Sequence, residues 1–293
     1  MKKNRKTKKR CYFDYNIYEK IRKDGSELTN TFFDNYDIFL SVAHIEEYYK
    51  AYKNDVNNEN KENLQKLKNI MVNNSKNRII LNPQKKGRII AKSQTFDECF
   101  NIIQKYDTRK VIDEHGERLN RYQNKRIKEL RENDKEAMHN SALDKEKIWD
   151  RPEVVKGIED FQKFYQDYFN QSVNSLLPVY GYYGTAKTIT ELPRDFTLKK
   201  FCFKNTIPEF KLLECVVEYL HKHLEECGYF RDKELRKTKS GIHDVSHSIY
   251  ATYCNYFVTQ DSYFRKRTEA IYYFLGIDTE VLSLDDFCGI LPM

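Results

Sequence analysis

Two carboxylates, one near each end of the chain, follow short apolar stretches. Asp14 comes directly after residues 11–13, and Asp261 comes two residues after residues 256–259. Aromatic and β-branched runs of this length are typical of buried strands. In a parallel α/β sheet, the carboxyl ends of the strands border the crevice in which ligands bind. We therefore expect these two strand ends to lie side by side and to share a divalent cation.

Three further acids are candidates for the same site. Glu46 and Glu47 lie in the first turns of a helix expected over residues 42–53, and Asp244 lies in the first turn of a helix expected over residues 242–254. Mg²⁺ and Mn²⁺ prefer carboxylate oxygens, and such ions activate water in phosphodiester hydrolysis. The alternative is structural, because the chain has 44 acids and an acid at a helix start is often a plain cap.

Strands and helices alternate in the two terminal parts of the chain, which predicts a parallel α/β sheet. Ser41 ends a second apolar strand over residues 36–40 and can cap the helix that follows. The other elements expected in these parts are helices over residues 17–23 and 262–275 and strands over residues 256–259 and 281–283.

The middle of the chain has a different character. Residues 78–81 and 88–91 predict either a hairpin or a third strand with an edge strand, and amphipathic helices are expected over residues 95–106, 154–169 and 210–224. Residues 181–188 lack one glycine of the sequence pattern of a phosphate-binding loop and are interpreted as an aromatic turn. The expected organisation is a basic tail at 1–10, a core formed by 11–53 and 240–293, and a mainly helical insertion at 54–239.

Charge and cysteine content narrow the possible classes of protein. The formal net charge of +7 equals the charge of the first ten residues, so the remaining 283 residues are neutral overall and indicate no general nucleic-acid surface. The seven cysteines form no C-x-x-C pair, which favours free thiols in a reducing, cytoplasmic setting. No apolar run approaches the roughly 20 residues that cross a bilayer, so no membrane contact is expected.

Four segments resemble those of PIN-like ribonuclease domains. Residues 13–17, Phe-Asp-Tyr-Asn-Ile, resemble the family's first strand, which ends in Asp-x-Asn. Residues 41–47 resemble the Ser-x-x-His-apolar-x-acid segment of a prokaryotic PIN-like subgroup. Residues 244–250 and 254–264 are similar to the closing half, where an Asp opens a helix and the next strand ends in Thr-x-Asp followed by a Phe. The resemblance covers about residues 10–53 and 240–287.

This resemblance implies a PIN-like three-layer α/β/α sandwich on a central parallel sheet, with a large, mainly helical insertion. It implies that Asp14, Glu47, Asp244 and Asp261 are catalytic acids that hold Mg²⁺ or Mn²⁺. Alignment on the serine and histidine of the second segment favours Glu47 over Glu46, although both stay open. The implied supporting polar residues are Asn16, Ser41, His44, His247 and Thr259.

The implied activity is that of a metal-dependent endonuclease acting on nucleic acid, with RNA favoured over DNA, and the family suggests a toxin or an antiphage effector. Basic residues of the tail and of residues 231–239 would contact phosphates, and the insertion would offer a surface for a protein partner. One alternative is a catalytically inactive PIN-like scaffold that binds RNA or protein. Another is an HD-type metal phosphohydrolase built on His243-Asp244, with His221, His223 and Asp261 or Asp278, but that fold is all-helical.

Overall fold

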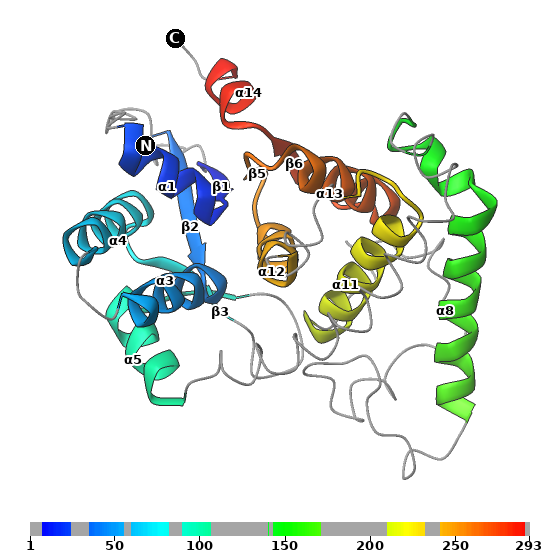
Figure 1. Ribbon diagram of the computed structural model, residues 1–293, viewed down its shortest axis with the longest axis horizontal. Coiled ribbons are helices and arrows are strands. Elements are labelled where there is room, and N and C mark those ends of the chain that lie inside the picture. Colours follow the sequence, from blue (N-terminus) through cyan, green and yellow to red (C-terminus); the bar gives the residue numbers. More distant parts are fainter. Residues whose placement is uncertain are drawn as a thin grey trace, which may run out of the picture.

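The computed structural model describes residues 8–24, 35–55, 60–81, 90–106, 140, 143–170, 210–231 and 241–290. A six-stranded sheet with the order β4-β3-β2-β1-β5-β6 runs through these residues (Figure 1). Five strands are parallel, and β4 pairs antiparallel with β3 at one edge. The predicted parallel α/β sheet is therefore confirmed. The strands are β1 (Lys9–Phe13), β2 (Tyr36–Ser41), β3 (Arg78–Leu81), β4 (Ile90–Ser93), β5 (Tyr256–Val258) and β6 (Glu280–Leu282).

The two ends of the chain meet in the middle of this sheet. On β1, Cys11 pairs with Ile38 of β2 on one side and with Tyr256 of β5 on the other. After β1 the chain continues to β2 and β3 on one side, whereas after β5 it continues to β6 on the other. The strand order therefore reverses between β1 and β5. In open α/β sheets such a switch point leaves a crevice at the carboxyl ends of the strands, where ligands bind.

Alternate residues of the strands face two separate cores, as the period of two along a strand requires. Cys11 and Phe13 of β1 belong to one core, whereas Tyr12 belongs to the other. The same division separates Tyr256 from Phe257 on β5. The sheet is thus buried on both faces, which explains why the sequences of its strands are nearly continuous apolar runs.

A different group of helices lies against each face of the sheet (Figure 1). The Cys11 face is covered by α1 (Tyr15–Asp24), α3 (Val42–Asn54), α4 (Lys61–Ser75), α5 (Phe96–Tyr106) and α14 (Leu284–Gly289). The Tyr12 face is covered by the 3₁₀ helix η1 (Lys147–Asp150) and by α8 (Pro152–Asn170), α11 (Phe210–Glu226), α12 (Gly241–Ala251) and α13 (Ser262–Leu275).

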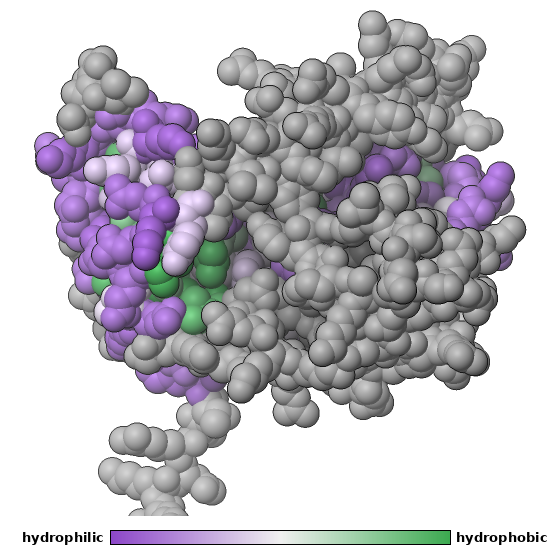
Figure 2. Space-filling view, turned by 90° about the horizontal axis from the view of Figure 1, so that it is seen from below, coloured by the Kyte–Doolittle hydropathy of each residue, from purple (hydrophilic) through white to green (hydrophobic). Residues whose placement is uncertain are grey.

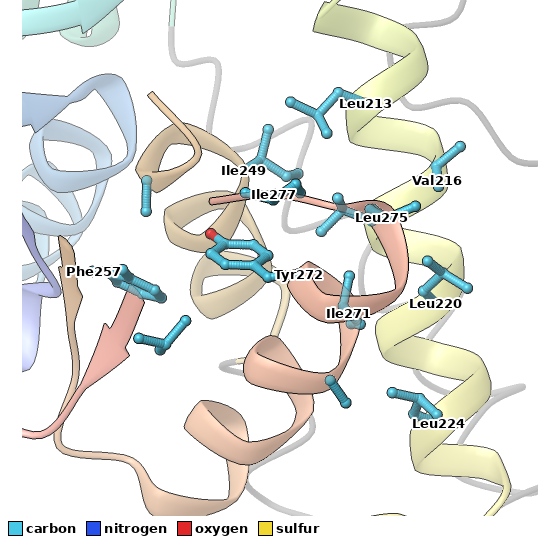
Figure 3. Close-up of a cluster of buried hydrophobic side chains, with 14 of the residues drawn as sticks. Leu213, Val216, Leu220, Leu224, Ile249, Phe257, Ile271, Tyr272, Leu275 and Ile277 are labelled. Atoms are coloured by element: carbon cyan, nitrogen blue, oxygen red, sulfur yellow. The ribbon is translucent and has the colours of Figure 1, made fainter. Parts of the chain in front are cut away.

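Helix α11 contributes one apolar stripe to the second core. Leu213, Val216, Leu220 and Leu224 recur every three or four residues, which places them on one side of the helix. Figure 3 shows Leu213 and Leu224 pointing toward the region of α12 and α13, where Ile249, Ile271 and Leu275 lie. All are buried, and full burial of one such side chain contributes roughly 1.5–3 kcal/mol. This packing anchors α12, which carries Asp244, and α13, which follows Asp261.

The structure extends the sheet into the range expected to be an insertion. Strand β3 pairs with β2, and β4 completes the hairpin, so the hairpin and the third strand proposed as alternatives are both present. Helices α4 and α5 pack on the same core as α1 and α3. The part of residues 54–239 up to Tyr106 therefore supplies two strands of the central sheet and two helices that cover one of its faces. The near-miss loop at 181–188, the tail at 1–7 and most of the basic stretch at 231–239 lie outside the described residues.

Among the described helices, none combines the length and apolar character that spanning a membrane requires. Figure 2 shows hydrophobic surface among hydrophilic side chains on one side of the molecule. The exposed large apolar side chains of the described residues include Tyr52 on α3 and Ile102 and Tyr106 on α5.

Candidate active site

Asp14 lies at the switch point of the sheet and is almost completely buried, with 1% of its surface exposed. Its backbone N–H donates to the carbonyl oxygen of Val258 at 2.9 Å, which continues the β1–β5 pairing by one residue. The hydroxyl of Thr259 donates to Asp14 Oδ2 at 2.8 Å. The ends of β1 and β5 thus lie side by side, as predicted, and Thr259 holds the Asp14 carboxylate in place.

The surroundings of Asp14 make its negative charge unfavourable. Burial raises the pKa of this carboxyl group, and the charge of Glu47 raises it further. The neighbouring His247 and the Thr259 hydroxyl act in the opposite direction, but the net shift is upward. A carboxylate kept in such a place is a candidate for function, because plain capping does not require burial.

His247 lies between Asp14 and Glu47. Glu47 is in the second turn of α3, and His247 is in the second turn of α12. Its Nε2 atom lies 2.9 Å from Glu47 Oε2 and 3.8 Å from Asp14 Oδ1. Because a carboxylate only accepts, Nε2 carries the hydrogen and donates it to Glu47. Burial opposes protonation of His247, but the hydrogen bond and charge of Glu47, together with Asp14 and Glu46, raise its pKa overall. The choice between Glu46 and Glu47 as a metal ligand stays a prediction.

Asp244 lies in the first turn of α12 and is affected by the negative charges of the other acids. Burial and the charges of Asp14, Glu47 and Asp261 all raise its pKa well above the ordinary value. The negative charges of three acids, drawn from both ends of the chain, therefore act on Asp244. We call Asp14, Glu47, Asp244 and Asp261 the acidic cluster.

Asp261 also has a structural role. It is the N-cap residue of α13, and its Oδ1 atom accepts the backbone N–H of Phe264 at 2.9 Å. Its own N–H donates to Thr259 Oγ1 at 3.3 Å. One carboxylate oxygen of Asp261 is therefore engaged in capping, as the structural alternative supposed, and the carboxylate still acts on Asp244 through its charge.

The predicted supporting residues differ in their positions. Ser41 and His44 are buried beneath the site, whereas Asn16 is exposed in the first turn of α1. His44 Nδ1 accepts the backbone N–H of Ser41 at 3.0 Å, and Nε2 lies 2.7 Å from the carbonyl oxygen of Phe13. Because a carbonyl only accepts, Nε2 carries the hydrogen and His44 is neutral; burial and the nearby His247 also lower its pKa well below the usual range.

Two residues at the site were missed by sequence reasoning. Tyr12 places its hydroxyl 2.7 Å from His247 Nδ1 and 2.6 Å from Ser41 Oγ. Arg267 on α13 is buried, donates to the carbonyl oxygen of Phe230, and lowers the pKa of Asp244 through its charge. Tyr12 precedes Asp14 by two residues on a strand and so shares its face, a signal that was available. Arg267 stands three residues after Phe264 and four before Ile271, so helical spacing already places it on the apolar side of α13.

The acidic cluster fits a hard divalent cation in its chemistry. Its donors are carboxylates, and the pKa values of Asp14 and Asp244 are raised by burial and then by neighbouring negative charge, both of which a bound cation would offset. Within the described ranges, no three His, Cys, Asp or Glu side chains already stand close enough together to hold a metal ion. Glu47 is held by His247 through Oε2, so Oε1 is the atom that it would offer to an ion.

The histidines of the HD-type alternative are engaged elsewhere. His221 Nε2 lies 3.2 Å from Ser248 Oγ, and His223 Nε2 lies 3.1 Å from the carbonyl oxygen of Val154. An HD-type enzyme would require an all-helical fold, whereas this chain has a parallel sheet with helices on both faces.

Searches with family models, among curated proteins and among solved structures found no match for this chain.

Proposed function

We propose that this chain is a metal-dependent endonuclease of PIN-like fold that hydrolyses phosphodiester bonds, with RNA as the favoured substrate. The observation that carries the proposal is the burial of Asp14 at the switch point of the sheet, where the charge of Glu47 raises the pKa of Asp14 and the charges of Asp14, Glu47 and Asp261 raise that of Asp244. A protein retains such mutually repelling carboxylates where a cation or a reaction uses them. The resemblance of the four sequence segments supports the choice of a nuclease.

In this proposal, Asp14, Glu47, Asp244 and Asp261 hold Mg²⁺ or Mn²⁺. When bound, the ion supplies a more acidic water and neutralises charge on the scissile phosphate. The residues of the chain position the reaction: Thr259 fixes Asp14 by its 2.8 Å hydrogen bond, and His247 orients Glu47. A role as a toxin or an antiphage effector belongs to the same proposal.

The test is cleavage of labelled single-stranded RNA and DNA by the purified chain in the presence of Mn²⁺. We expect Asp14→Asn and Asp244→Asn each to lower the rate by roughly a hundredfold or more. Asp278→Asn is the matched control, because Asp278 is exposed and precedes β6, at the amino end of that parallel strand, whereas Asp14 follows β1 at its carboxyl end. Equal rates for the wild type and both site variants would reject the site.

A second candidate function is that of an inactive PIN-like scaffold. It is favoured by the contact of His247 with both Glu47 and Asp14, because a protonated imidazole would balance their charge without a metal. Calorimetry with Mn²⁺ separates the two candidates, since a scaffold balanced by His247 has no need to bind the ion.

A further inference from the structure

The polar network beneath the acidic cluster assigns a role to Tyr12. We propose that Tyr12 is a positioning residue whose hydroxyl fixes the ring of His247 and, through that ring, the carboxylate of Glu47. The effect on catalysis rests on the proposed function, whereas the effect on the ring of His247 does not. Hydrogen bonds of Tyr12 and His247 join β1, the start of α3 and α12.

Both nitrogens of His247 have partners. Nε2 donates to Glu47 Oε2 at 2.9 Å, and Nδ1 lies 2.7 Å from the hydroxyl oxygen of Tyr12. A hydroxyl group can donate to an unprotonated Nδ1 or accept from a protonated one, so this contact persists in either state. A half-turn of the ring would place carbon atoms against both partners. Tyr12 therefore selects the orientation in which Nε2 faces Glu47.

Among the residues that the structure describes, no other hydrogen-bond partner of His247 Nδ1 takes this role. The hydroxyl of Tyr12 also lies 3.3 Å from His44 Nδ1, but that nitrogen already accepts the backbone N–H of Ser41. Ser41 Oγ, at 2.6 Å, is the second partner of the hydroxyl. Tyr12 and His247 have no exposed surface, so water cannot replace a lost hydroxyl without a rearrangement.

The ring of Tyr12 holds its hydroxyl in place. It packs against His44, His247 and Phe257 with centroid separations of 4.8, 5.7 and 5.8 Å. These contacts survive in Tyr12→Phe, which removes only the oxygen atom. The substitution thus separates positioning by the hydroxyl from packing by the ring.

The test is NMR of the full chain with ¹⁵N-labelled histidine rings at one fixed pH, with His247 assigned from His247→Gln. We expect one set of His247 ring signals in the wild type and in Tyr219→Phe, the control that loses a 2.6 Å hydroxyl bond between α11 and α8. In Tyr12→Phe we expect doubled or exchange-broadened His247 signals. An unchanged His247 spectrum in Tyr12→Phe, or two ring populations in the wild type, would overturn the proposal.

The second measurement is RNA cleavage by the same variants with Mn²⁺. Tyr12→Phe should lower kcat about 10- to 100-fold at nearly constant KM, as loss of a supporting hydrogen bond does at metal sites, whereas Tyr219→Phe should stay within about twofold. A Tyr12→Phe enzyme as active as the control would also overturn the proposal. If the wild type cleaves nothing, the proposed function fails, and the NMR result alone decides the role of Tyr12.

Discussion

Replacement of Thr259 by valine tests the bond that holds Asp14 at the switch point. Thr259 has no exposed surface, its hydroxyl donates to Asp14 Oδ2 at 2.8 Å, and its oxygen accepts the N–H of Asp261 at 3.3 Å. Valine has nearly the same shape but no oxygen. Loss of a hydrogen bond to a charged, buried group costs about 1.5–3 kcal/mol, and the weaker accepted bond adds about 0.5–1 kcal/mol. We expect Thr259→Val to lower the free energy of unfolding by about 2–4 kcal/mol.

Thr259→Ser is the matched control, because it keeps the hydroxyl and loses one methyl group, at a cost of about 1 kcal/mol. The assay is urea denaturation in EDTA, which keeps the comparison free of bound metal. A shift of the midpoint at constant slope reports stability alone. If the valine variant is no less stable than the serine variant, the hydroxyl does not hold Asp14 and the described geometry of the site is wrong.

Three further substitutions should change the free energy of unfolding. Burial raises the pKa of Glu218 to about 7, so the folded protein binds the carboxyl proton more tightly than the unfolded chain does. The free energy of unfolding therefore falls as the pH rises from about 4.5 to 7. In urea denaturation, Glu218→Gln should be stabilising at pH 8 and nearly neutral at pH 4. Gly157→Ala should cost about 1–3 kcal/mol, since the new Cβ would lie 2.0 Å from His223 Cε1, and the cost should vanish in a His223→Ala background. Asp244→Asn should raise the stability of the metal-free protein by about 0.5–2 kcal/mol in thermal melts with EDTA while it lowers nuclease activity.

The sequence predicts the parts of this fold in which local signals agree with tertiary packing. Helix α13 has the bounds expected for it, because Asp261 supplies an N-cap and Gly276, with φ 65°, supplies the left-handed residue that ends a helix. Strands β1 and β5 are continuous apolar runs, which suits a sheet that is buried on both faces. The proximity of Asp14 and Thr259 follows from the pairing of these two strands.

The parts that were not predicted depend on contacts between distant residues. The sequence predicts a strand at β3, but its place beside β2 is decided by tertiary pairing rather than by its own four-residue pattern. His247 and Glu47 are 200 residues apart, and their hydrogen bond follows from the packing of α12 beside α3. In the sequence, Tyr12 looks like any aromatic residue of the core. Its proposed role depends on the contact of its hydroxyl with His247, which only the fold creates.

Titration of the purified, metal-free chain with Mn²⁺ in a calorimeter tests the central claim most directly. The account predicts saturable binding to the wild type, unchanged binding to Asp278→Asn, and binding weakened at least tenfold in Asp14→Asn and Asp244→Asn. Absence of Mn²⁺ binding to the wild type, or equal binding to all four proteins, would contradict it.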